Sequence, residues 1–137
     1  MSDLIRESVL GIGPHFIYFA LALIVAMLFV VIYIWITPYH EFALIRSGNA
    51  AAAISLGGAL VGFSLPLAKA VAQSANVLDM LIWAGVAFVA QLIAFALARV
   101  VLKDLTSEIE GGKPAAAIFL AAVSISIGLL NSAAMTE

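Results

Sequence analysis

The sequence predicts an all-α integral membrane protein in which four transmembrane helices form two parallel-repeat helical hairpins. The first observation is composition, since 65% of the 137 residues are hydrophobic and 10% are charged, whereas soluble domains are about half apolar and about a quarter charged. The second observation is that the apolar residues fall into four runs of about 20, the length that crosses a bilayer as a helix. The third is an internal repeat.

The internal repeat relates residues 45–56 to residues 109–120, at an offset of 64, with seven of the twelve aligned positions identical. We therefore expect one four-helix membrane domain over residues 1–137, with a first repeat at about 14–72 and a second at about 78–136. Each repeat crosses the membrane twice, so both enter it in the same direction. The expected symmetry is a pseudo-two-fold axis along the membrane normal, with the alanine-rich faces of the second and fourth spans near the centre.

The four spans are predicted at residues 16–36, 50–70, 80–102 and 115–134. Residues 1–14 lack the basic start of a cleavable signal peptide, and we expect them to form a short lead-in at the membrane surface. Pro66 is expected to kink or end the second span, because a proline removes one helical hydrogen bond. Residues 71–79 are predicted to be a short polar loop.

The connection between the first two spans contains residues 38–46, which we predict to be a short interfacial helix. Thr37 is a suitable N-cap for it, and Tyr39 is expected to face lipid. Glu41 and Arg46 could pair at the surface, where such a pair contributes little stability. Residues 104–113 resemble this connection, with a short charged helix followed by a glycine turn.

The basic residues predict the orientation of the chain. The two long connections carry four of them and the opposite side carries two: Arg46, Arg99, Lys103 and Lys113 against Arg6 and Lys69. Loops rich in lysine and arginine stay in the cytoplasm. Both long connections are therefore expected in the cytoplasm and both termini on the outer side.

Gly58 and Gly62 form a Gly-x-x-x-Gly pattern in the second span, which is typical of close packing between membrane helices. Two interpretations are open at this stage. The glycines pack against the chain's own helices, or they form a symmetric contact between two copies.

Two polar side chains, Gln91 and Asn131, fall inside the third and fourth spans. An amide in the bilayer is costly unless it is hydrogen-bonded, so both should face the interior of the bundle. Gln91 can join helices by bonding to a serine such as Ser55 or Ser124, or it can belong to a polar ring in an oligomeric pore. Asn131 poses the same choice.

The sequence shows no group of residues suited to catalysis. It contains no cysteine, which excludes disulfides and thiolate-bound metals, and no basic cluster that would indicate nucleic-acid binding. His15 and His40 are expected on opposite sides of the membrane, where they could not share a metal. No nucleophile–base pair is visible. We therefore expect no enzymatic activity and no cofactor.

A resemblance extends over nearly the whole chain. It is carried by residues 36–41, 44–45, 48–52, 58–67, 83–85, 91–92 and 131–136, among them Thr37-Pro38-Tyr39-His40-Glu41 and Gly58-x-x-x-Gly62-Phe63. With these motifs the chain resembles the YjfL-like family of small bacterial inner-membrane proteins, built on domain of unknown function 350. The resemblance implies a four-helix protein of the bacterial inner membrane, with both termini periplasmic under the orientation above. It also implies genes near those for membrane-stress proteins of the phage-shock type and an ATP-grasp ligase. It carries over no catalytic or binding residue.

Two functions are consistent with this picture. The favoured one is a membrane scaffold or stress-associated partner protein, in which the cytoplasmic loops dock a cytoplasmic or membrane protein through Arg46, Lys103 and Lys113. The alternative is an oligomeric channel or permeation subunit, motivated by Gln91 and Asn131. In both cases we expect contact with membrane lipids and assembly into a homo-oligomer.

Overall fold

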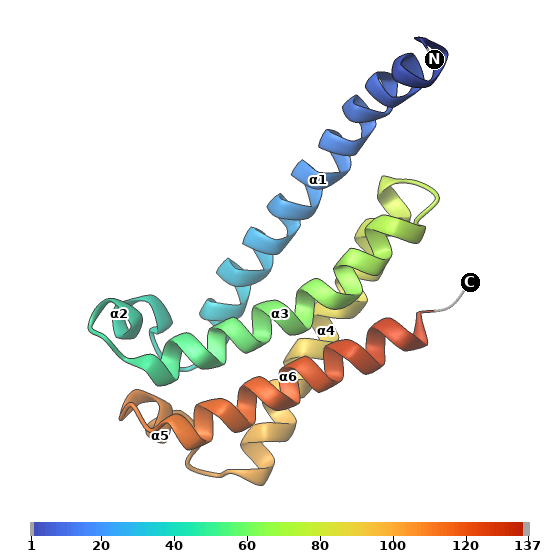
Figure 1. The fold of residues 1–137 in the computed structure, drawn as a ribbon. Coiled ribbons are helices and arrows are strands. Elements are labelled where there is room, and N and C mark those ends of the chain that lie inside the picture. Colours follow the sequence, from blue (N-terminus) through green and yellow to red (C-terminus); the bar gives the residue numbers. More distant parts are fainter. Residues whose placement is uncertain (1, 136–137) are drawn as a thin grey trace.

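The computed structural model describes residues 2–135 of the chain. Within that range it contains six helices and no strand (Figure 1): α1 (Ser2–Ile36), α2 (Glu41–Arg46), α3 (Ala50–Gln73), α4 (Val77–Val101), α5 (Leu105–Glu110) and α6 (Pro114–Ala134). Four of these helices, α1, α3, α4 and α6, are long enough and apolar enough to cross a membrane. The prediction of an all-α protein with four membrane-spanning helices is confirmed.

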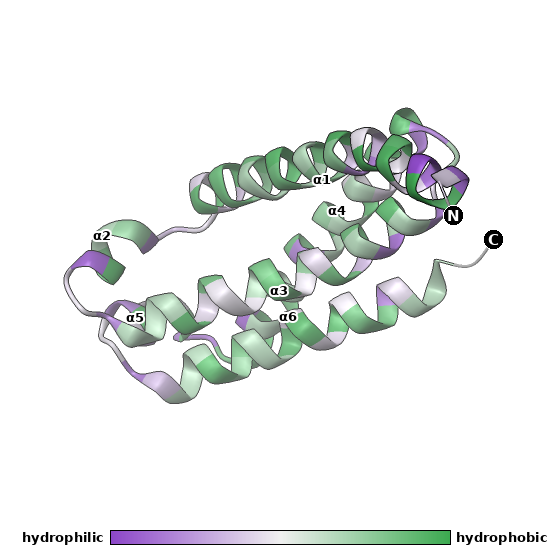
Figure 2. Ribbon diagram, turned by 45° about the horizontal axis from the view of Figure 1, so that its top comes forward, coloured by the Kyte–Doolittle hydropathy of each residue, from purple (hydrophilic) through white to green (hydrophobic). Residues whose placement is uncertain are grey.

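The two short helices lie at the same end of the bundle, and we call this end, made by residues 37–49 and 102–113, the loop end. The start of α1 and the end of α6 lie at the opposite end (Figure 1). Figure 2 shows that the hydrophilic residues gather mainly at these two ends, while the long helices are apolar over most of their length. This is the distribution expected of a bundle that spans the hydrocarbon layer.

Helix α1 differs from the prediction, because it starts at Ser2 and runs through Pro14 without a break. Residues 2–14 are therefore part of α1 and do not form a separate segment, while their expected position at the membrane surface stays a prediction. A proline in a helix interior removes one backbone hydrogen bond, and α1 continues past it. At 1.5 Å per residue the helix is about 50 Å long, which exceeds a hydrocarbon core of about 30 Å.

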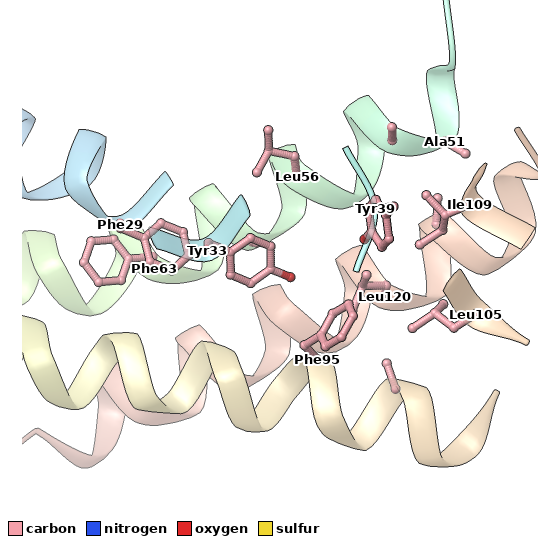
Figure 3. Packing of buried hydrophobic residues seen from close by; sticks show 14 of the residues in the cluster. Phe29, Tyr33, Tyr39, Ala51, Leu56, Phe63, Phe95, Leu105, Ile109 and Leu120 are labelled. Carbon is pink, nitrogen blue, oxygen red and sulfur yellow. The ribbon is translucent and has the colours of Figure 1, made fainter. Parts of the chain in front are cut away.

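Aromatic contacts attach the second half of α1 to the bundle, whereas its first half leans away from α3 (Figure 1). The Phe29 ring stacks on Phe63 of α3 at a centroid distance of 4.2 Å. Tyr33 meets Phe95 of α4 edge-on at 6.3 Å, and Figure 3 shows these rings in one row. Only 11% of the most apolar stretch of α1 is buried inside the protein, so most of the large side chains on this helix face outward.

The alanine-rich faces of α3 and α6 are buried against each other and against α4: Ala51, Ala52, Ala59, Ala116, Ala117 and Ala121. Pro66 lies inside α3 and does not end it. The predicted loop over residues 71–79 is shorter than expected, because α3 extends to Gln73 and α4 starts at Val77.

The bounds of the elements recur at the offset of 64 found in the sequence. α2 starts at residue 41 and α5 at 105, and α3 starts at residue 50 and α6 at 114. Gly48 lies just before α3 and Gly112 just before α6. Both have a positive φ, of 92° and 77°, a backbone conformation that favours glycine. Each donates its N–H to a carbonyl three residues back, at 3.0 Å. The position of a symmetry axis along the membrane normal stays a prediction.

Candidate functional site

Gly58 and Gly62 lie on the buried face of α3, where this helix crosses α6. A Cβ atom on Gly58 would overlap Ala121, and one on Gly62 would overlap the carbonyl of Ser124. From the other side, a Cβ on Gly128 would overlap the backbone of Gly62. The glycines therefore allow two backbones of the same chain to touch, and the structure places them in an internal contact.

Gln91 of α4 is fully buried against this crossing. Its Nε2 donates to the backbone carbonyl of Ser124 at 3.1 Å, and the same nitrogen lies 2.7 Å from where a Cβ on Gly62 would be. Of the two serines named from the sequence, Ser55 and Ser124, the partner is Ser124, and the acceptor is its main-chain oxygen. Gln91 Oε1 and Ser124 Oγ are buried and have no hydrogen-bond partner within the described chain.

Asn131 lies two helical turns beyond Ser124 on α6 and is half-buried, with no partner for its Nδ2 among residues 2–135. No hydrogen bond links it to Gln91 in that part of the chain. Gln91 therefore holds α4 against α6, and Asn131 stands separately toward the opposite end from the loops.

Asn49 connects the two hairpins at the loop end, a role that the sequence analysis did not predict. Its Oδ1 accepts the N–H of Ala52 at 3.0 Å and so caps the start of α3. Its Nδ2 donates to the carbonyls of Ile109 and Glu110, at 2.9 and 3.2 Å. An asparagine before an alanine run is a recognisable N-cap signal, but the bonds to α5 span 60 residues and leave no local signal.

The three basic residues proposed as loop contacts, Arg46, Lys103 and Lys113, are all exposed. Arg46 ends α2, Lys103 follows α4, and Lys113 precedes α6, so all three belong to the loop end. Because Asn49 joins the two connections there, these cations are carried on a single linked platform.

The corner between α1 and α2 is buried, which corrects three expectations. Glu41 is only 1% exposed, so it forms no surface pair with Arg46. Thr37 does not cap α2, since its Oγ1 donates to Glu41 Oε2 at 2.6 Å and the N-cap residue is His40. Tyr39 is buried and does not face lipid. Hydropathy assigned these residues to the interface, but the loop folds back onto α3.

The two histidines show no sign of metal binding. His15 lies beside Phe19 on α1, with ring centroids 6.2 Å apart, and His40 is exposed near the loop end. Among residues 2–135 no three side chains of the His, Cys, Asp or Glu types come together in a way that could hold a metal ion.

A groove of about 550 Å³ separates the first half of α1 from α3. It is apolar over most of its surface and is lined by Gly11, Pro14, His15, Tyr18, Phe19, Ala22, Ala68 and Val71. It opens to the surroundings of the bundle, so an apolar chain or helix in the membrane can enter it.

Comparisons with known proteins place this geometry in a family. The family model described as Domain of Unknown Function (DUF350) matches residues 7–135. The chain belongs to the DUF350 family. The UPF0719 inner membrane protein YjfL of Escherichia coli (strain K12) is 34% identical over 132 residues, which cover 96% of this chain and 98% of that protein. The UPF0719 transmembrane protein YshE of Bacillus subtilis (strain 168) is 24% identical over 135 residues, or 97% and 98%. No solved structure matches the chain.

Membership of the DUF350 family agrees with the resemblance seen in the sequence, and the relatives are named as membrane proteins of unassigned function. In this DUF350 chain one set of polar groups, around Gln91, is enclosed by α3, α4 and α6. Other polar groups lie at the two ends of the bundle. At the loop end the hydrogen bonds of Asn49 join the two connections that carry the exposed charges, and this end is therefore the candidate functional site.

Proposed function

We propose that this protein is a non-catalytic scaffold of the bacterial inner membrane, whose loop end docks a protein partner with an acidic surface. The observation that carries the proposal is the pair of hydrogen bonds from Asn49 to Ile109 and Glu110. They join the connections of the two hairpins, so Arg46, Lys103 and Lys113 have a common rigid support. A preorganised surface loses less entropy when it binds.

The orientation of this platform is part of the proposal. The excess of basic residues on the loop end favours the cytoplasm for α2 and α5 and the periplasm for both termini. Under that orientation the partner is cytoplasmic or attached to the inner face of the membrane.

The experiment compares two sets of neutralising substitutions. Arg46→Gln, Lys103→Gln and Lys113→Gln together remove the three basic side chains of the platform and leave Asp104, Glu108 and Glu110 in place. Arg6→Gln with Lys69→Gln is the matched control at the opposite end. Proteins cross-linked to the chain in whole cells are quantified by mass spectrometry. We expect a defined partner to be lost with the first set and kept with the second. Retention of every cross-linked protein in both sets would contradict the proposal.

The channel alternative has weaker support from the geometry. Gln91, which would have to line the pore, is enclosed by helices of its own chain, and an amide used in packing is not free to face a channel between copies. The alternative predicts ion or solute flux in proteoliposomes that changes with Gln91→Leu. Vesicles that contain folded protein and show no flux would rule it out.

We further propose that copies of the chain assemble into a homo-oligomer through α1. This helix is the least buried of the four spans, and its first half stands apart from α3. Native mass spectrometry of protein extracted in lipid nanodiscs measures the stoichiometry directly. A mass corresponding to one chain with bound lipid would refute the assembly.

A further inference from the structure

The corner between α1 and α2 contains a buried carboxyl group that the proposed docking function does not use. We call Tyr33, Thr37, Tyr39, Glu41 and Ser55 the corner site. All five side chains are buried, and the Thr37 hydroxyl donates to Glu41 Oε2 at 2.6 Å. Two polar atoms of the site, Glu41 Oε1 and the Tyr33 hydroxyl oxygen, are buried and have no hydrogen-bond partner among residues 2–135. Figure 3 shows Tyr33 pointing its hydroxyl group toward Tyr39.

The surroundings of Glu41 do not support a negative charge. The titratable groups that face the corner site are Tyr33 from α1, Tyr39 and His40 from the connection, and Glu110 from α5. His40 is the one group among them that can be positive, and its side chain is exposed. A buried carboxylate without a cation costs several kcal/mol. Burial accordingly raises the pKa of Glu41, against the smaller opposing effects of the Thr37 hydroxyl and His40.

The second half of the chain shows that packing alone does not require a carboxyl group here. At the offset of 64 residues, Leu105 takes the place of Glu41 as the first residue of its short helix. Leu105 is 0% exposed, so an apolar side chain occupies the equivalent position. Val101 stands in place of Thr37 but is 65% exposed, so the second half has no buried hydroxyl at this position. The polar corner site therefore exists in one half of the chain and adds a chemical property that the fold can do without.

We propose that the corner site is a proton-binding site, in which Glu41 is neutral in the folded protein and loss of its proton to water releases α2 from the bundle. A neutral carboxyl carries one proton. The Thr37 hydroxyl already donates to Oε2, so the proton belongs on Oε1, the oxygen that accepts no hydrogen bond among residues 2–135. After ionisation the buried charge has no cation, and exposing α2 to water removes this penalty. The inference goes beyond the docking function and does not depend on it.

The sign of the pH effect follows from the higher affinity of the folded state for the proton. Below the ordinary pKa of 4.5, both folded and unfolded chains hold the proton, and the contribution of Glu41 to stability is complete. As the pH rises from there toward the raised pKa of the folded state, the unfolded chain has released its proton and the folded chain has not. The stability of α2 in the bundle should therefore fall over this interval and level off above it.

Infrared spectroscopy of the intact protein in nanodiscs tests the protonation state without relying on a variant. The C=O stretch of a protonated carboxylic acid should persist to pH values above the ordinary pKa of 4.5 and should disappear on titration to alkaline pH. Glu41→Gln should lack this band, which assigns it. Loss of the band at or below the ordinary carboxyl pKa in the wild-type protein would overturn the proposal.

Cysteine labelling tests the release of α2, and the absence of native cysteine makes each introduced thiol unique. Leu44→Cys reports the half-buried face of α2 and Ser47→Cys is the exposed reference. We expect the ratio of the two labelling rates to rise several-fold with pH in the native background. In the Glu41→Gln background the ratio should be constant. A ratio that is constant with pH in the native background would contradict the release.

Discussion

Replacing Gly62 by alanine should force α3 and α6 apart. The new Cβ would overlap the Ser124 carbonyl and would lie 2.7 Å from Gln91 Nε2. Ordinary contacts of a Cβ begin near 3.4 Å, so the amide alone would have to move by about 0.7 Å. The backbone carbonyl of a neighbouring helix cannot move without the whole helix, which makes this a change in the crossing of α3 and α6.

The expected loss of stability in Gly62→Ala has two causes. Overpacking of a close contact typically costs about 1–3 kcal/mol. Displacement of the Gln91 amide also weakens its hydrogen bond to Ser124, which contributes about 0.5–1.5 kcal/mol. The two effects together predict a loss of about 1.5–4.5 kcal/mol, or roughly a 10- to 1,600-fold change in the unfolding equilibrium constant.

Gly57 provides a matched control on the same helix. It is exposed, and a Cβ there meets nothing within 4 Å. Gly57→Ala should therefore leave the protein as stable as before or stabilise it by up to about 1 kcal/mol, because alanine is the better helix former. Unfolding is followed by tryptophan fluorescence in mixed micelles with an increasing fraction of denaturing detergent. Equal stability of Gly62→Ala and Gly57→Ala would refute the assigned crossing.

Three further predictions concern polar groups. Gln91→Leu should lower stability by about 1 kcal/mol in the same assay, less than Gly62→Ala, because a hydrogen bond between membrane helices contributes about 0.6 kcal/mol on average. A loss of stability as large as that of the glycine variant would show a larger role for the amide. Asn49→Ala should speed amide hydrogen exchange in α5 and cost about 1–2 kcal/mol, whereas Ser47→Ala, on an exposed turn, should do neither; unchanged exchange in α5 would contradict the link between hairpins. A single cysteine at Ser107 should resist a membrane-impermeant maleimide added to whole cells and one at Ala75 should react, and the opposite result would invert the proposed orientation.

Hydropathy and helix-terminus signals predicted most of the fold. Three of the four spans were placed to within a few residues because their apolar runs match the thickness of a bilayer, and α5 was expected from a short charged stretch. The exception is α1, whose residues 2–14 were expected to be a lead-in before the span but belong to the same helix. A proline in a helix interior removes one backbone hydrogen bond, and the helix continues past it. The polar residues near the start of the chain indicate where the apolar run begins, and they do not indicate where the helix begins.

The site was less accessible to prediction, since burial of a polar residue depends on contacts distant in sequence. Gln91 was singled out because an amide inside an apolar run is conspicuous, although its acceptor turned out to be a main-chain carbonyl that no pattern can specify. Glu41 was assigned to the surface because its neighbours resemble an ordinary interfacial loop. Its burial depends on how the residues 37–40 return the chain onto α3, a conformation without a sequence signature.

Comparing the connection between α1 and α3 with the connection between α4 and α6 shows which features are specific to the first half of the chain. Both connections have a six-residue helix followed by a glycine with positive φ, so one backbone framework serves two sets of side chains. The framework tolerates leucine at position 105, and it contains glutamate at position 41. Because Leu105 is buried as completely as Glu41, exchanging Glu41 for leucine should keep the fold while removing any dependence of the corner on pH. The polar corner is thus a separable property of the loop end, and it can be removed without disturbing the contacts that Asn49 makes with α5.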